Sequence, residues 1–211
     1  PPNHFTFAPQ DTIPMPRKSS PKQPAYRLKE ITDENMNALQ KSLRDAIYAG
    51  PRGKRQSLTG PFQIWLNAPE LGLLAQAVGA HVRYKTTLSP RLSETVILVT
   101  AQLWKAQYEW YAHEPQALKG GVSQKTINDI KAGRAPKSAP KDERALYDFV
   151  KELYKNKRVS DRTYKRCHAF LGDQGMVELV GIAGYYSLIA MTLNVFRAPI
   201  PDGPAPFKEP K

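Results

Sequence analysis

The chain has 211 residues, with 31 Lys and Arg against 19 Asp and Glu, which gives a formal net charge of +12 at pH 7. This length suits one well-buried domain, and the positive charge favours anionic partners such as acidic metabolites, nucleic acid or anionic surfaces. The single cysteine, Cys167, excludes an internal disulfide and any CxxC motif. No Cys/His cluster has the spacing of zinc ligands, so we expect no metal site.

The first part of the chain predicts an extended arm and then a helix. Residues 1–26 contain seven prolines and little periodicity, which is typical of an extended segment. Thr32 is the expected cap of a helix over residues 33–48, which has apolar residues on one face. After this helix, Gly50 and Pro51 begin a basic loop. That loop either holds an anion or is a solvated turn.

Two proline-initiated helical segments are expected next. Gly60 and Pro61 begin a short turn of helix that carries Phe62 and Trp65. Pro69 begins a longer helix. Its apolar stripe consists of Leu71, Leu74, Ala75, Val78 and Val82.

Residues 89–121 predict two consecutive helices at the centre of the fold. Pro90 suits the first helical position, with Ser89 as its cap, and residues 96–99 are apolar on all sides. A helix that is apolar all round is expected to be buried. In the second helix Pro115 should cause a kink, and the following pair of glycines should end the helix.

Three ionisable residues on these two helices are candidates for chemistry. Glu94 lies inside the apolar helix, where a carboxylate is costly unless it is paired. Glu109 and His113 are four residues apart in the next helix and therefore share one face. Two carboxylates and an imidazole on neighbouring helices can transfer protons. The alternative is a buried Glu–His hydrogen bond that only ties the two helices together.

The last third of the chain predicts helices over residues 123–133, 142–156 and 160–172, followed by a long apolar helix. Residues 179–196 form an uncharged run whose length reaches the lower limit for a membrane span. Because this run contains glycines, tyrosines and an asparagine, we expect a central buried helix and no membrane span. Residues 199–211 are rich in proline and predict an extended tail.

The sequence therefore predicts an all-α bundle of about seven helices, with a single helical domain over residues 27–198. Residues 151–166 carry an excess of basic side chains that could bind nucleic acid. The aromatic residues there, Tyr154 and Tyr164, have the spacing of core residues instead of a stacking platform. We therefore expect a solvated basic helix face here and no nucleic-acid partner.

Glu94, the tripeptide Tyr108-Glu109-Trp110 and His113 resemble the signature of the carboxymuconolactone decarboxylase family, which includes alkyl hydroperoxidase D. The resemblance covers roughly residues 31–201. It implies an alkyl hydroperoxidase D-like helical fold and a homo-oligomer. It also places the site where the two central helices meet the turn that carries Phe62 and Trp65. The candidate lining residues are Trp104, Tyr108, Tyr186 and Asn194.

Peroxidase members of this family carry a CxxC motif before the histidine. Counted back from His113, the two cysteine positions are Ala106 and Glu109, while the upstream glutamate of the motif is Glu94. The acid–base residues are therefore matched and both thiols are absent. Thiol peroxidase chemistry needs a thiolate and a resolving thiol, so the decarboxylase-type members are the better match.

The leading hypothesis is a lyase-like enzyme without a cofactor that performs acid–base chemistry, decarboxylation included, on a small anionic molecule. His113 would be the general acid or base, and Glu109 and Glu94 would orient and tune it. One alternative is a non-catalytic binding or assembly protein on the same fold. Another is a peroxidase that uses Cys167, which would require this thiol near His113. The expected location is cytoplasmic, or exported if a signal peptide preceded Pro1.

Overall fold

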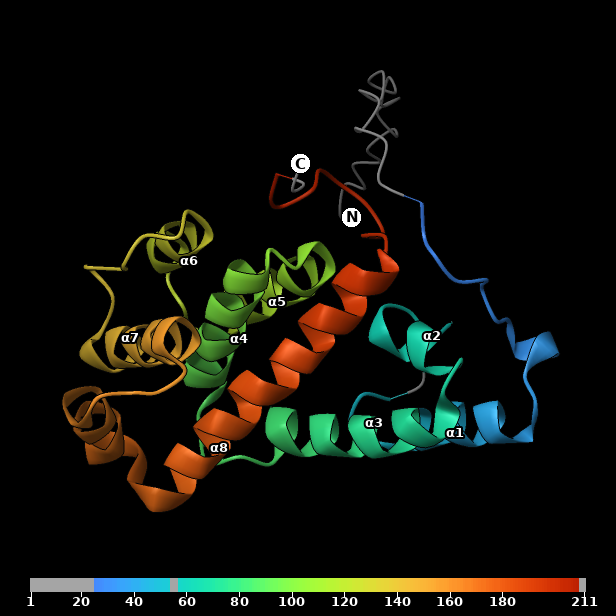
Figure 1. Cartoon of the computed structure of the whole chain (residues 1–211), viewed down its shortest axis with the longest axis horizontal. Helices are drawn as coiled ribbons and strands as arrows, with labels where there is room; N and C mark the ends of the chain where they lie inside the picture. Colours follow the sequence, from blue (N-terminus) through green and yellow to red (C-terminus); the bar gives the residue numbers. More distant parts are fainter. Residues whose placement is uncertain (1–24, 54–56, 209–211) are drawn as a thin grey trace, which may run out of the picture.

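The computed structural model describes residues 25–53 and 57–208, and every regular element within these residues is helical (Figure 1). The predicted all-α fold is confirmed. Nearly all of the predicted N-terminal arm lies outside the described residues. The elements are η1 (Asp33–Asn35), α1 (Ala38–Ala49), α2 (Pro61–Trp65), α3 (Pro69–Tyr84), α4 (Pro90–Trp104), α5 (Gln107–Gly120), α6 (Gln124–Lys131), α7 (Lys141–Asn156) and α8 (Asp161–Phe196).

The first long helix begins later than the sequence pattern suggested. Thr32 precedes only the short turn η1, and α1 starts after Asn37. The Asn37 side chain accepts a hydrogen bond from the backbone N–H of Gln40, and the Gln40 side chain accepts one from the backbone N–H of Asn37. This reciprocal capping box satisfies two donors and fixes the helix start. Leu43 and Ile47 then bury the inner face.

Helix α4 is the centre of the molecule. Every residue from Leu92 to Gln102 is buried, as its apolar sequence predicted. The helix packs against α5, α6, α7 and α8. Lys105 adopts a left-handed conformation that ends α4 and turns the chain into α5. Helix α5 continues through Pro115 and ends at Gly120, and the next residue, Gly121, is also left-handed.

Helix α8 consists of two segments that meet at Gly172. Gly172 has a φ of 63°, a left-handed value that interrupts the helix where the sequence predicted a stop. The chain changes direction in this part of α8, and the second segment then crosses the molecule diagonally (Figure 1). This segment contacts α2, α3, α4 and α5, and so it brings residues from distant parts of the sequence to one place.

By length and composition, α8 is the one helix among the described residues that could cross a membrane. Of its most apolar window, 44% is buried, so one face of the helix packs inside and another is exposed. Leu179 and Ile182 lie inside, whereas Val177 and Val180 are exposed.

The segment after α8 returns to the core over part of its length. Phe207 is buried, and its ring meets Trp110 edge-on with the two centroids 5.2 Å apart. Its backbone N–H donates to the side-chain oxygen of Gln107, and the Gln107 amide donates back to the Phe207 carbonyl, both at 2.8 Å. The Tyr111 hydroxyl donates to Asp202. These contacts cover the outer side of α5.

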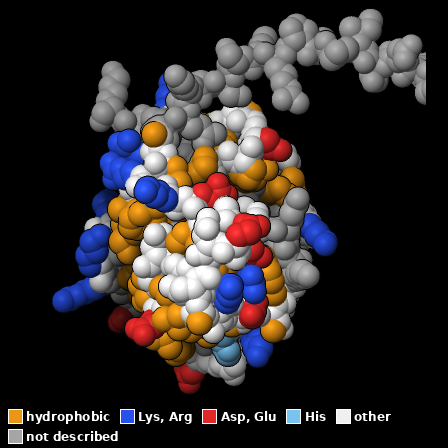
Figure 2. All heavy atoms as spheres, turned by 90° about the vertical axis from the view of Figure 1, so that its right-hand side faces the viewer, with side chains coloured by type: hydrophobic (Ala, Val, Ile, Leu, Met, Phe, Trp, Pro, Cys, Tyr) orange, Lys and Arg blue, Asp and Glu red, His pale blue; other side chains and the backbone are white. Residues whose placement is uncertain are grey.

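On the face shown in Figure 2, Lys and Arg side chains gather along one edge, and hydrophobic side chains are exposed in several places between them and the centre. On this face, Lys and Arg are therefore most numerous along that edge. Aliphatic side chains with large exposed fractions also lie on α3, namely Leu71, Leu74 and Val78.

Candidate active site

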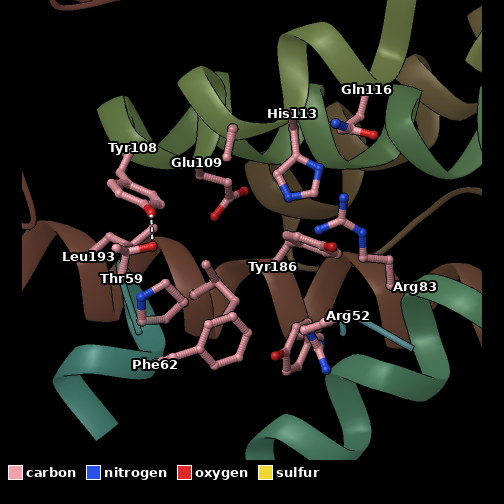
Figure 3. Close-up of a pocket in the computed structure, with 14 residues that line it drawn as sticks. Arg52, Thr59, Phe62, Arg83, Tyr108, Glu109, His113, Gln116, Tyr186 and Leu193 are labelled. Atoms are coloured by element: carbon pink, nitrogen blue, oxygen red, sulfur yellow. Dashed lines mark hydrogen bonds between the residues drawn. The ribbon is translucent and has the colours of Figure 1, made fainter. Parts of the chain in front are cut away.

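A cavity of about 240 Å³ lies between α2, α3, α5 and α8 (Figure 3). Drug-sized ligands occupy pockets of roughly 300–1,000 Å³, so this cavity fits a smaller molecule. Its walls combine ionisable, aromatic and aliphatic side chains. They are Arg52, Thr59, Pro61, Phe62, Arg83, Tyr108, Glu109, Ala112, His113, Gln116, Tyr185, Tyr186, Ile189 and Leu193.

His113 and Glu94 form a buried pair beside this cavity. The imidazole Nδ1 lies 2.7 Å from a carboxylate oxygen of Glu94, across the α4–α5 interface. A carboxylate on Nδ1 holds the proton on that nitrogen and leaves Nε2 as the acceptor. No described residue hydrogen-bonds Nε2, and His113 lines the cavity. The Tyr186 ring meets the imidazole edge-on, with the centroids 5.0 Å apart.

The charge state of His113 follows from its surroundings. Burial lowers its pKa, because a charged imidazolium loses its hydration there. The Glu94 carboxylate acts in the opposite direction, and the nearby Arg83 guanidinium lowers the pKa further. The net direction is downward, so the imidazole is neutral near pH 7 and can accept a proton at Nε2.

Glu109 is the second ionisable group in the cavity. It is 1% exposed, and neither of its carboxyl oxygens has a hydrogen-bond partner among the described residues. Burial raises its pKa well above the ordinary value, and the negative charge of Glu94 raises it further. Glu109 therefore keeps its proton to a higher pH than an ordinary glutamate does, and in this neutral form it can donate a proton. A proton acceptor and a proton donor thus lie one helical turn apart on α5.

Arg83 and Arg52 give the cavity its positive charge. Arg83 projects from α3 and Arg52 from the loop after α1, and Figure 3 shows both at the end opposite Tyr108. Neither forms an ion pair with a described residue. Arg52 donates a long hydrogen bond of 3.4 Å to the carbonyl of Gln76. Both guanidinium groups lie over the ring of Tyr84, at 5.5 Å and 5.9 Å from its centroid. This contact orients them and leaves N–H groups for an anion.

Gly79 makes room for the tyrosine beneath these arginines. A Cβ at this position would collide with the Tyr185 hydroxyl and would lie 2.9 Å from Nη2 of Arg52. Burial raises the pKa of Tyr185 to about 12, and burial also raises the pKa of Tyr186. Both phenols therefore remain protonated and can act only as neutral donors or acceptors.

The predicted site residues divide into two groups. The cavity brings together His113, Glu109, Phe62, Tyr108 and Tyr186, with Glu94 directly behind the imidazole. The other three predicted residues, Trp65, Trp104 and Asn194, do not line the cavity.

Trp65 is buried and packs edge-on against Phe62, with the centroids 5.9 Å apart. The Asn194 amide donates to the carbonyl of Trp104 at 2.8 Å, a contact that joins the ends of α8 and α4. The pairing inside the site also differs from the expectation. Glu94 alone holds the imidazole, whereas Glu109 is free of it.

Sequence reasoning did not identify Arg83 and Tyr185 as site residues. Arg52 belongs to the basic loop after α1, for which the sequence left two alternatives, an anion site or a solvated turn. For Arg83 there was no signal, because a single arginine near the end of an amphipathic helix is ordinary. No group of three His, Cys, Asp or Glu within residues 25–53 and 57–208 could hold a metal ion.

Residues 69–152, from the start of α3 into α7, match the model of the carboxymuconolactone decarboxylase family. Over this segment the chain is similar to that family. The matched segment contains Glu94, Glu109 and His113 as well as Arg83. Comparison with curated proteins gave no match.

One solved structure with the same fold is a protein of unknown function from Agrobacterium tumefaciens, described as a candidate antioxidant defence protein AhpD. It has a TM-score of 0.61 and 18% sequence identity, and the match covers 69% of this chain and all of that one. At this identity the likeness shows the fold alone. The carboxymuconolactone decarboxylase family match and this neighbour together account for the helical architecture around the cavity.

Proposed function

We propose that this chain is an enzyme that transfers protons at carbon in a small carboxylate, without a bound cofactor. The observation that carries the proposal is the arrangement of His113 and Glu109. A proton acceptor and a neutral proton donor line one small cavity, and two unpaired guanidinium groups line the same cavity. A sealed Glu–His bond with no access to solvent space would favour the structural alternative, but here a cavity reaches the imidazole.

The roles follow from the contacts. Glu94 holds Nδ1 of His113, so Nε2 is the general base. Glu109 has no protein partner among the described residues and is the general acid. The guanidinium groups of Arg83 and Arg52 bind the substrate carboxylate, because a charged donor on an anionic acceptor forms the stronger kind of hydrogen bond. Tyr186 packs against the imidazole and fixes its ring plane.

Decarboxylation is the form of this chemistry that the family suggests. The bond between the departing carboxylate carbon and its neighbour breaks, and CO2 leaves. The electron pair remains on the neighbouring carbon as an enolate. Glu109 then supplies the proton that this carbon needs and is left as a carboxylate. Nε2 of His113, which lines the same cavity, takes a proton from solvent and passes it to Glu109, so turnover depends on both residues. A second carboxylate of the substrate stays on the arginines throughout, which keeps the reacting carbon beside Glu109.

The test uses carboxymuconolactone and small keto acids in D2O, with NMR detection of CO2 loss and of deuterium incorporation at carbon. We expect His113→Ala to abolish turnover with little change in melting temperature. The control is His81→Ala, because His81 is exposed on α3 and lies outside the cavity. Folded His113→Ala protein with full activity would end the enzymatic assignment.

Glu94→Gln separates the proposed base from a structural histidine. The Glu94 carboxylate stabilises the imidazolium, so its removal should lower the pKa of His113 further. We expect a lower maximal rate and an acidic limb of the pH profile that moves to lower pH. The structural reading forecasts a lower melting temperature and activity in proportion to folded protein. A pH profile that does not move would contradict the base role.

A further inference from the structure

A second cavity of about 240 Å³ adjoins the first one. It is bounded by the segment before η1, the loop before α2 and the segment after α8. The lining is mostly apolar, with Leu58, Ala198, Pro199 and Pro201 among its residues. Apart from Tyr108, its lining residues lie outside the segment that matches the family, so the family match does not account for it.

The two cavities share one wall, which consists of Tyr108 and Thr59. The Tyr108 hydroxyl donates to Oγ1 of Thr59 at 2.9 Å, and Figure 3 shows this bond at the end of the first cavity away from Arg83. Gly60 permits this arrangement. A Cβ on Gly60, whose φ is +59°, would lie 2.6 Å from the Tyr108 ring.

This wall can open at small cost. Its hydrogen bond joins two hydroxyl groups in an exposed environment, where water can replace either partner. Thr59 is exposed and Tyr108 is half-buried, so the phenol ring can turn outward without leaving a buried donor unpaired. With the ring turned, the two cavities become one elongated space that has arginines at one end and apolar side chains at the other.

The second cavity is partly open to solvent, because Glu30, Thr59, Pro199 and Pro201 in its lining are exposed. Removing its apolar walls from water by covering them with an apolar group is favourable. The lining also contains Tyr26, whose buried hydroxyl has no hydrogen-bond partner within the described part of the chain. That hydroxyl could form a specific contact with a ligand, and Glu30, Gln63 and Thr59 are further polar side chains in a lining that is otherwise apolar.

We propose that the second cavity receives an apolar chain or ring of the same molecule whose carboxylate binds Arg83 and Arg52. The substrate class is therefore a carboxylate with an apolar tail, and the Tyr108–Thr59 pair is the wall that the tail displaces. The inference rests on the proposed function, because the arginine end of the molecule is fixed by that proposal. It adds a specificity site that selects tail length.

The experiment titrates the full chain with straight-chain carboxylates from acetate to octanoate. Alanine methyl NMR signals report the position of the ligand, since Ala112 lines the first cavity and Ala198 the second. Short members should shift only the Ala112 signal. Members long enough to pass the wall should shift both signals, and each methylene beyond it should raise the affinity roughly fourfold.

Two variants test the path of the tail. Ala198→Leu fills the second cavity and should abolish the gain with chain length. Its matched control is Ala169→Leu, an exposed helical position outside both cavities, which should bind the series as the native protein does. Tyr108→Phe removes the hydrogen bond of the wall, so long members should bind about two- to tenfold more tightly, and short members should not.

The outcomes separate this inference from the proposed function. If the short carboxylates shift Ala112 but affinity does not rise with chain length, the second cavity is not a tail site and the inference is overturned alone. The same holds if Ala198→Leu binds octanoate as tightly as the native protein, or if octanoate shifts Ala198 without Ala112. If no member shifts Ala112, and Arg83→Gln changes nothing, the carboxylate site itself has failed and both proposals fall.

Discussion

At the scale of single residues, Glu109 couples function to stability through its proton. Its pKa is raised well above the ordinary 4.5 by burial, so the folded protein keeps a proton that the unfolded chain has lost. The stability that such a group gives the folded protein is fully present below pH 4.5 and is lost as the pH rises toward the folded-state pKa. Keeping the Glu109 carboxyl neutral above pH 4.5 thus lowers the free energy of unfolding by a measurable amount.

Glu109→Gln should remove that cost. Within the window above pH 4.5, the native protein should lose up to about 1.4 kcal/mol of stability per pH unit relative to the variant. We therefore expect the two proteins to be similar at pH 4.5 and the variant to be the more stable at pH 8, while its turnover is lost. Denaturant unfolding at several pH values measures this. A stability difference that does not change with pH would show that Glu109 is ionised in the folded protein.

Cys167 gives the second prediction at this scale. The thiol is fully buried, it donates to the carbonyl of Ala145 at 3.4 Å, and burial raises its pKa to about 11. It is absent from the cavity that His113 lines. Because the thiolate is the nucleophile in thiol peroxidases, we expect no peroxide consumption with a dithiol reductant. Dithiol-dependent turnover that disappears in Cys167→Ser would contradict this expectation.

The sequence could predict that the candidate acid–base residues lie together, because helical spacing alone decides which of them share a face. Glu109 and His113 must point the same way at four residues apart, and Glu94 in an apolar helix must find a buried partner. Which carboxylate pairs with the imidazole depends on how α4 docks on α5, and no spacing rule states that. The same holds for Arg83, since its direction into the cavity depends on the contact between α3 and α8.

At the scale of elements, the turn into α2 positions the wall between the two cavities. Gly60 has a φ of +59°, a value that residues with a side chain rarely adopt. It also lies so close to the Tyr108 ring that an added Cβ would collide with it. The sequence predicted a helix start here from Pro61 and could not predict the close approach. The segment after α8 is a second example of packing that the sequence could not predict. Its prolines indicated an extended segment, and the packing of Phe207 on Trp110 became visible only in the fold.

Gly60→Ala should destabilise the protein by about 1–3 kcal/mol through backbone strain and the collision with Tyr108. Removing the ring relieves the collision but not the strain, so Gly60→Ala should cost less in a Tyr108→Ala background than in the native one. Thermal unfolding of the four proteins of this cycle measures the coupling. Equal costs in both backgrounds would show that the ring and the turn are independent.

At the scale of the whole molecule, two neighbouring helices, α3 and α8, carry exposed apolar side chains, which we call the α3–α8 surface. Leu71, Leu74 and Val78 are 54%, 71% and 52% exposed and repeat at helical spacing along α3. The neighbouring face of α8 carries Val177 and Val180, which are 74% and 51% exposed. The two helices also pack against each other. Clustered exposed apolar side chains of this kind mark association surfaces.

The resemblance to the family implied a homo-oligomer, and we propose that this α3–α8 surface is the contact between its identical chains. Light scattering at micromolar concentration should then give a mass above the 23.7 kDa of one chain. Leu74→Asp places a charge at the most exposed position of the α3 stripe and should shift the protein to monomers. Leu118→Asp is the matched control, because Leu118 is 43% exposed on α5, away from this surface. A native protein that scatters as a single chain would show that there is no such contact. A Leu74→Asp variant that remains associated would show that the contact lies elsewhere.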